Sequence, residues 1–327
     1  MKLRAGDYVA VRSAEDIEAT LDEKGCLEGL PFMPEMAPYC GTVHRVYKRI
    51  DKIIDIVANT GLRRMTNTVT LADLRCDGSA HRGCQSGCQM LWKEAWLRRC
   101  SAREFASRDP LARTRPAPGL LARLKPIAHP APEERHRCQA TELFRASRYL
   151  HRWDPRQYIA PLWFRNVTFV EFLRGVSIAL FNSVQRLHKG CEYPYWVGSR
   201  MEKTPTSSLG LQEGEWVRVK SKEEILKTLD KSNRNRGLWF DREMVRFCGG
   251  RFRVLRRIDR LIEEKSGRLV ELRNPSVMLD GVTARGEFYR FNPQNDYVLW
   301  REIWLERLQE RPVVAAGPVG GIACSED

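Results

Sequence analysis

An internal duplication is the feature that most constrains the fold of this chain. Residues 6–52 align with residues 214–260 at a constant offset of 208 without a gap, and 21 of these 47 positions are identical. The same offset relates the run Trp92–Leu97 to Trp300–Leu305. Similarity at one fixed offset is typical of a repeated structural unit. We therefore predict two tandem copies of a single fold.

Each copy is predicted to be mainly β. A short strand of alternating residues opens the copies at Tyr8–Val11 and at Trp216–Val219. The runs Trp92–Leu97 and Trp300–Leu305 are expected to form short closing helices, in which tryptophans at i and i+4 share one face. A Gly-Asp-x-Val start followed by short strands resembles the SH3-like barrels at the level of fold.

A different segment separates the two copies. Residues 108–135 contain six prolines, which disfavour helix and central strand, so a flexible linker is expected there. Residues 168–188 carry apolar side chains at helical spacing, and Glu171 and Arg174 indicate a packed helix of a soluble protein. The fold class is α+β, mainly β with α. The predicted parts are a first barrel repeat (1–107), the linker (108–135), a central helical segment (136–210), a second repeat (211–312) and a loose tail (313–327).

Composition limits the class of protein further. A hydrophobic share of 43% excludes wholesale disorder, and no window approaches the roughly 18 uninterrupted apolar residues of a membrane span. The N-terminal residues lack the apolar core of a secretory signal, so we expect a cytoplasmic protein without a membrane partner. Its ten cysteines are then expected to be reduced thiols or metal ligands.

The first copy contains a cysteine- and histidine-rich run. Cys76, His81, Cys84 and Cys88 follow the pattern Cys-x4-His-x2-Cys-x3-Cys, with glycines interleaved. Glycines let a loop fold tightly around an ion. None of the equivalent positions in the second copy is a cysteine or histidine; they are Ala284, Tyr289, Asn292 and Asp296. The shared fold does not require these groups, and their clustering in one copy indicates a metal site.

The identity of the metal stays open at this point. Cys84-x3-Cys88 has the spacing of a zinc knuckle, and Cys76 with His81 would complete a Cys3His site. We expect a helix to begin near Gln89, which would place Cys88 at its N-terminus, where the helix dipole stabilises a thiolate.

The alternative is an iron–sulfur cluster with a fourth cysteine from elsewhere in the chain. Cys138 is the best remote candidate, and Cys100 and Cys191 are weaker ones. Cysteines are in surplus near the motif and no Cys-x2-Cys pair is present, so the cluster is placed ahead of zinc.

Other polar groups are weaker candidates. Cys40 and Cys248 are equivalent in the two copies and are interpreted as buried thiols of the fold. Glu142 would act as a general acid or base if its segment lay over the metal, although a solvated helix glutamate is the favoured interpretation. His136 and His151 flank the same segment and are interpreted as surface histidines.

Three segments together resemble an uncharacterised bacterial family with two SH3-like barrel repeats and a Cys/His-rich metal motif. They are Cys138–Leu143, Trp92–Leu97 and the Cys76–Cys88 run. The resemblance implies no activity for this chain, and the sequence has no phosphate loop, dinucleotide turn or serine-hydrolase elbow.

The residues themselves favour a metalloprotein that acts as a redox or Lewis-acid enzyme on an unknown small molecule. The alternative is a nucleic-acid-binding protein or a protein-interaction scaffold with a structural zinc. The net charge, 55 − 41 = +14, suits phosphate contacts. Nucleic acid is nevertheless not favoured as a partner, since the basic residues form no dense stripe.

Overall fold

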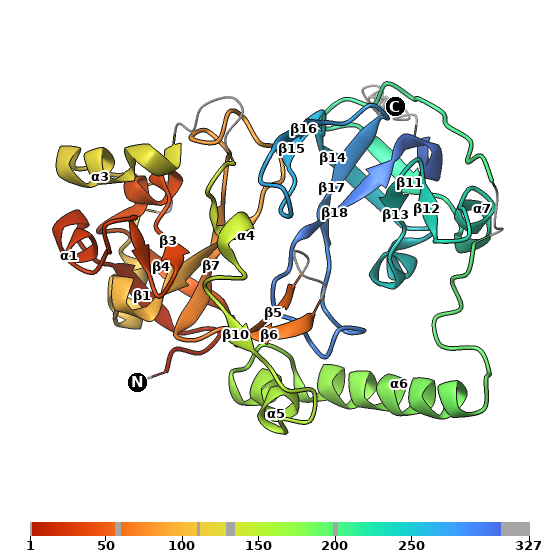
Figure 1. Ribbon diagram of the computed structural model, residues 1–327, viewed down its shortest axis with the longest axis horizontal. Helices are drawn as coiled ribbons and strands as arrows, with labels where there is room; N and C mark the ends of the chain where they lie inside the picture. The colour runs from red at the N-terminus through yellow and green to blue at the C-terminus, as the bar shows by residue number, and fades with distance from the viewer. Residues whose placement is uncertain (1, 56–59, 110–111, 129–134, 199–201, 309–327) are drawn as a thin grey trace, which may run out of the picture.

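The computed structural model of the protein describes residues 2–55, 60–109, 112–128, 135–198 and 202–308. The predicted loose tail, 313–327, lies outside these residues. The described chain forms two barrel-like β domains with helices around them (Figure 1). The predicted sheet-rich, mixed fold with two tandem barrel-like repeats is thus confirmed.

The first repeat is built on a five-stranded antiparallel sheet. Its elements are β1 (Tyr8–Val11), α1 (Ala14–Glu18), β2 (Cys26–Leu27), β3 (Leu30–Pro31), η1 (Pro34–Tyr39), β4 (Val43–Arg49), β5 (Lys52–Asp55), β6 (Gly61–Arg64), β7 (Thr68–Arg75), β8 (Gln89–Lys93), η2 (Glu94–Trp96), β9 (Leu97–Arg99) and α2 (Ala102–Ala106). The order of the main sheet is β8-β7-β4-β1-β9. Val9 and Val11 of β1 are buried in its core, together with Val69 and Leu71 of β7.

The second repeat has the same construction. Its elements are β11 (Trp216–Val219), α7 (Lys222–Leu226), β12 (Arg234–Asn235), β13 (Leu238–Trp239), η3 (Arg242–Phe247), β14 (Arg251–Arg257), β15 (Arg260–Ile262), β16 (Leu269–Glu271), β17 (Ser276–Thr283), β18 (Tyr297–Arg301), η4 (Glu302–Trp304) and β19 (Leu305–Arg307). Its sheet order, β18-β17-β14-β11-β19, matches that of the first repeat strand for strand. Even the shift in register recurs, between Val46 and Lys48 in one copy and between Val254 and Arg256 in the other.

Each tryptophan-containing segment is a strand followed by one short 3-10 turn, and not the single helix that was predicted. Trp92 lies in β8 and Trp96 ends the short turn η2, and both side chains are fully buried. Pairing of β8 with β7 satisfies the backbone groups that a helix would otherwise have to satisfy. The predicted closing helix, and with it the predicted helix start near Gln89, is therefore wrong.

The proline-rich segment contains a helix that packs on the first repeat. α3 (Pro118–Ala128) begins with a proline, whose fixed φ suits the first position of a helix. Leu120 and Leu124, four residues apart, are fully buried in the core of the first repeat. The flexible linker expected over 108–135 is therefore in part a helix, with Pro118 at its start and Pro126 near its end.

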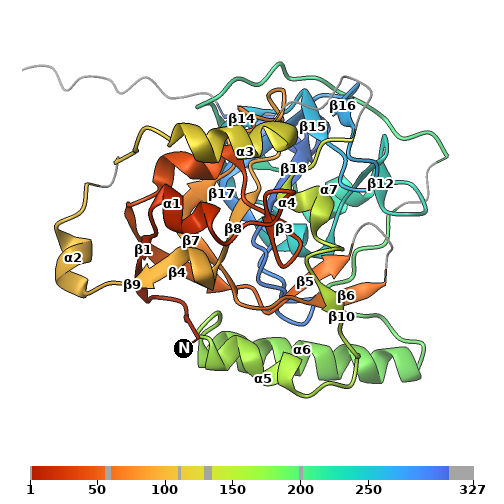
Figure 2. The same cartoon turned by 60° about the vertical axis from the view of Figure 1, so that its left-hand side comes forward.

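The central segment contains α4 (Gln139–Glu142), β10 (Arg148–Tyr149), α5 (Arg156–Trp163) and α6 (Phe169–Leu187). The helices α5 and α6 lie along one side of the molecule (Figures 1 and 2). α6 begins at the Thr168–Glu171 capping box, as its spacing predicts. Its apolar stripe is not packed as expected, since Leu173, Leu180 and Leu187 are 48%, 66% and 82% exposed.

The two repeats contact each other through reciprocal loops. Gln85 of the first repeat accepts hydrogen bonds from the backbone N–H groups of Asp259 and Arg260, at 2.7 and 3.0 Å. In return, the backbone N–H of Ile54 donates to Gln294 Oε1 of the second repeat at 2.8 Å. The hairpin β15–β16 of the second repeat therefore lies beside the loop that precedes β8 of the first repeat. In the same way, the hairpin β5–β6 of the first repeat lies beside the loop that precedes β18 of the second.

Candidate metal centre

The cysteine-rich run forms a tight loop between β7 and β8. The backbone N–H of Cys76 donates to the carbonyl of Cys88 at 2.9 Å and so closes the loop. Inside it, Gly78 has a φ of +71°, and a Cβ there would lie 2.0 Å from the carbonyl oxygen of Cys84. Glycine is thus required at position 78, and the loop brings three cysteines and a histidine into a short space.

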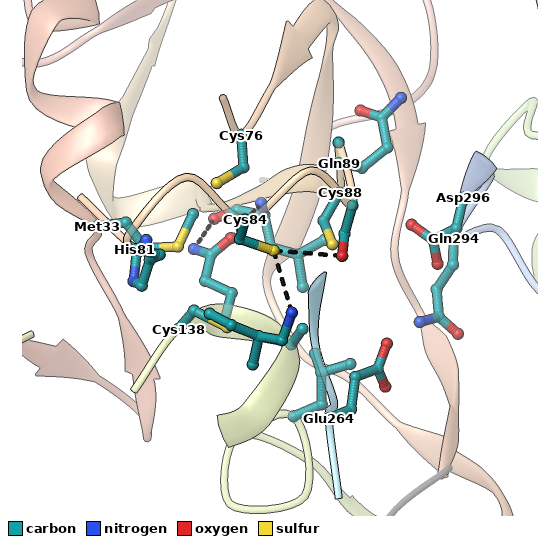
Figure 3. Close-up of a pocket in the computed structure, with 17 residues that line it drawn as sticks. Met33, Cys76, His81, Cys84, Cys88, Gln89, Cys138, Glu264, Gln294 and Asp296 are labelled. Atoms are coloured by element: carbon teal, nitrogen blue, oxygen red, sulfur yellow. Dashed lines mark hydrogen bonds between the residues drawn. The ribbon is translucent and has the colours of Figure 1, made fainter. Parts of the chain in front are cut away.

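All five predicted metal ligands line one pocket between the two repeats (Figure 3). The loop supplies Cys76, His81, Cys84 and Cys88, and the fifth ligand, Cys138, is the residue that precedes α4. The second repeat contributes four residues to the lining, which are Ile262, Glu264, Gln294 and Asp296. The structure therefore joins the remote cysteine to the local three, while Cys100 and Cys191 are not among the residues that line this pocket.

The thiols influence one another electrostatically. Burial raises the pKa of the Cys138 thiol to about 11, and nearby Cys84 adds to this increase. Burial also raises the pKa of Cys76, with further contributions from Glu35, Cys138 and Cys84. Without a cation these two thiols are protonated near neutral pH. A bound metal would supply the positive charge that thiolates need here.

Cys88 is not stabilised by a helix dipole, because strand β8 follows it. Burial raises the pKa of its thiol well above the usual value, and Asp296 and Glu264 raise it further. Cys84 has a different environment, since its sulfur accepts the backbone N–H of Ile262 at 3.4 Å. An N–H donor to sulfur is a typical outer contact of a metal-bound thiolate.

His81 is held by a carboxylate that sequence analysis missed. Its Nδ1 lies 2.6 Å from Glu35 Oε1, which also accepts the backbone N–H of Ala80 at 3.2 Å. His81 is buried, and its Nε2 has no hydrogen-bond partner among the described residues. Glu35 recurs as Glu243 in the second repeat. Because both copies have glutamate at this position, the sequence carries no signal of its contact with the first-copy histidine.

Two further acidic residues at the pocket were also missed. Burial raises the pKa of Glu264 to about 7, and the nearby Asp296 carboxylate adds to the increase. Burial raises the pKa of Asp296 to about 6, while Arg75 opposes that shift. Both residues belong to the second repeat and reach the pocket through packing of the two repeats. Their positions in the sequence carry no signal of this contact.

The remaining candidates lie elsewhere or in other surroundings. Glu142 is buried and not solvated, is ion-paired with Arg145 at 3.2 Å, and is not among the residues that line the pocket. His136 is 2% exposed, so its interpretation as a surface residue was wrong; its backbone N–H donates to Gly267, which draws it inside. His151 is exposed.

The equivalent cysteines of the two copies are separate from this pocket. Cys40 is buried in the first core, and Cys248 packs against the second core. Burial raises the pKa of the Cys40 thiol to about 11, as expected for a thiol among apolar neighbours. These two residues supply matched controls for the pocket cysteines.

The functional proposal for this protein rests on the side chains of the pocket. No helix among the described residues is both long and apolar enough to cross a bilayer. The pocket instead combines thiols, an oriented histidine and carboxyl groups, which together form a typical metal-binding donor set. No family model, no curated protein and no solved structure matches this chain.

Proposed function

We propose that this protein is a metalloprotein whose pocket holds an iron–sulfur cluster on Cys76, Cys84, Cys88 and Cys138. The observation that carries the proposal is that these four thiols, from two separate segments, line one pocket. Four cysteine thiolates are the usual ligand set of such clusters. The second repeat has no cysteine at the equivalent loop positions, so a role in folding does not explain the three loop cysteines.

The spacing of the ligand atoms supports a cluster over a single zinc ion. A tetrahedral zinc holds its thiolates at about 2.3 Å, and therefore about 3.8 Å from one another. Among the described residues, the group of ligand atoms within 4.8 Å of one another is Glu35, Cys76 and His81. No three of the four cysteine sulfurs form such a group with one another among the described residues. A cluster distributes its thiolates over several irons and so accommodates the wider spacing.

Such a centre would act in redox or Lewis-acid chemistry on a small molecule, with carboxyl groups of the second repeat at its edge. His81 offers an unpartnered Nε2 at the pocket. Its Nδ1 lies 2.6 Å from Glu35 Oε1, a contact that fixes the orientation of the ring and leaves Nε2 as the unprotonated nitrogen. The histidine is thereby suited to accept a proton or to complete the metal's coordination.

Purification without oxygen tests the proposal. We expect brown protein that contains iron and acid-labile sulfide, and we expect Cys84→Ala to be colourless and free of iron. Cys138→Ala tests the remote ligand and should lose the cluster as well. Cys248→Ala is the matched control and should keep its metal. Colourless wild-type protein without iron, or full iron content in Cys84→Ala, would overturn the assignment.

The second candidate is a tandem-barrel scaffold or nucleic-acid-binding protein with a structural zinc. The observation that favours it is the close group of Glu35, Cys76 and His81, which has the spacing of ligands on one ion. It predicts colourless protein with one zinc. Binding to DNA or RNA that weakens as salt increases would support a nucleic-acid partner, and no binding at low salt would exclude one.

A further inference from the structure

A second cavity lies on the other side of the loop that reaches the cysteine pocket. Asn295 lines this cavity of about 790 Å³, while its neighbours Gln294 and Asp296 line the cysteine pocket. The cavity is formed by both repeats and by the turn between α5 and α6. Its lining residues include Arg45, Tyr47, Lys48, Arg165, Glu171 and Arg285.

The charged lining of this cavity is strongly positive. Arg45, Lys48, Arg165 and Arg285 face one carboxylate, Glu171, so the formal charge is +4 − 1 = +3. Glu171 is already engaged, because its Oε2 accepts the backbone N–H and the hydroxyl of Thr168 at 2.8 and 2.9 Å. Glu171 offsets part of this charge, since it lies near Lys48 and Arg285, and the lining keeps a net positive charge.

The four cationic side chains are not paired. Among the described residues, none of them makes a hydrogen bond through its charged group or lies within 4.0 Å of a carboxylate oxygen. Arginines at this protein's surface commonly do so; Arg307, for example, bonds Glu215 at 3.2 Å. Grouped cations that outnumber the acids beside them and form no ion pair are a usual arrangement for recognition of an anion.

Lys48 is the most constrained of the four. Burial lowers the pKa of its ammonium group to about 8; nearby Glu171 opposes the shift and Arg285 adds to it. Its ammonium lies 5.5 Å from the centre of the Tyr47 ring. A partly buried cation without a partner costs free energy, which an anionic ligand would offset.

The counterpart of Arg45 in the second repeat lies in different surroundings. Arg253 is the counterpart of Arg45, and its Nε donates to the carbonyl of Gly214 at 2.9 Å. The cavity beside it is lined by two acids, Glu213 and Glu215, against two arginines, Arg253 and Arg307, which gives a charge balance of zero. The cavity beside Arg253 therefore has no net positive lining, in contrast to the cavity that includes Arg45.

We propose that the cavity around Lys48 and Arg285 binds a small molecule that carries a phosphate or a carboxylate group. The guanidinium groups provide paired donors for either group, and the lysine provides a point charge. This inference is independent of the metal, because none of the four cations lines the cysteine pocket.

Calorimetric titration with inorganic phosphate and, separately, with succinate tests the inference and distinguishes the two anions. We expect saturable binding of at least one of them, weakened about tenfold or more in Lys48→Met and in Arg285→Met. Arg253→Met is the matched control and should bind like the wild type. Arg285 is exposed, so Arg285→Met tests the site even if Lys48→Met fails to fold.

Two results would overturn the inference. One is the absence of saturable binding of both anions to the wild type. The other is equal weakening in Arg285→Met and Arg253→Met, which would indicate a general charge effect. Metal-free Cys84→Ala should keep full anion binding, so failure of the metal assignment and failure of the anion site give different results.

Discussion

The loop at 76–88 and its counterpart at 284–296 have the same backbone and different side chains. Three backbone hydrogen bonds of the first loop recur in the second at the offset of 208. In the first loop they run from Cys76 to Cys88 (2.9 Å), from His81 to Gly78 (2.9 Å) and from Cys84 to His81 (3.1 Å). In the second they run from Ala284 to Asp296 (2.9 Å), from Tyr289 to Gly286 (3.0 Å) and from Asn292 to Tyr289 (3.0 Å). The second loop forms this structure without cysteine or histidine. The loop structure therefore does not depend on the cysteines and the histidine of the first copy.

The carboxylate under each loop has different partners in the two copies. Glu243 uses its two oxygens for the backbone N–H groups of Arg285 and Phe288, at 3.1 and 2.9 Å. Glu35 keeps one such contact, with Ala80, and gives the same oxygen to His81. A residue that supports the loop in one repeat thus orients a candidate ligand in the other.

The largest effect is expected where the two loops are the same. Gly286→Ala places a Cβ 2.1 Å from the carbonyl oxygen of Asn292, and Gly78→Ala makes the equivalent clash with Cys84. Each should lower the free energy of unfolding by about 3 kcal/mol, since φ is positive and backbone blocks the space. Urea unfolding measures both. Gly281→Ala, with a φ of +69° and no atom within 4 Å, is the control and should cost only about 1 kcal/mol.

Substitution of the two equivalent carboxylates, Glu243 and Glu35, should lower the free energy of unfolding by different amounts. Glu243→Gln turns an amide toward one of two N–H donors and should destabilise the protein by about 1–3 kcal/mol. Glu35→Gln keeps an oxygen acceptor for His81 and Ala80, and Glu35 Oε2 has no partner to lose among the described residues. Its cost should be below about 1 kcal/mol. Equal losses of unfolding free energy, measured by thermal or urea unfolding, would show that the two carboxylates stabilise their loops equally and would contradict this prediction.

Removal of the hydrogen-bond acceptor of the buried tryptophan should cost the same free energy of unfolding in both repeats. Trp96 Nε1 donates to Thr20 Oγ1 at 3.0 Å, and Trp304 Nε1 donates to Thr228 Oγ1 at 2.9 Å. Thr20→Val and Thr228→Val should each cost about 1 kcal/mol, because each leaves a buried indole N–H unpaired. Urea unfolding of the two variants provides the comparison. A difference of more than about 1 kcal/mol would show that the two cores are not equivalent.

The hairpin β5–β6 should make stability depend on pH, whereas the hairpin β15–β16 should not. Lys52 in β5 is fully buried, and its ammonium donates to the carbonyl of Gln157, whereas the counterpart Arg260 in β15 is exposed. Burial lowers the pKa of Lys52 from 10.5 to about 8. Between these values the unfolded chain binds more protons, so stability should rise with pH across this interval. Lys52→Met should flatten this rise in unfolding measured from about pH 8 to about pH 10.

Sequence reasoning was accurate where it compared the repeats and failed where it relied on local spacing. The offset of 208 predicted equal sheets, and the structure shows them strand for strand. The i, i+4 tryptophans suggested a helix, but strand β8 and the turn η2 place both rings in the core. Apolar spacing in α6 predicted a helix correctly and its burial incorrectly, because periodicity defines a face and not what covers it.

The sequence alone determined the duplication, the two barrel-like repeats and the three loop cysteines that lack counterparts. Tertiary structure decided that Cys138 joins them, that Glu35 holds His81, and that Glu264 and Asp296 close the pocket. The physical reason is distance along the chain. A repeat pattern encodes contacts within each copy, whereas the packing between copies depends on pairs such as Gln85 and Arg260, which are 175 residues apart and follow no shared pattern.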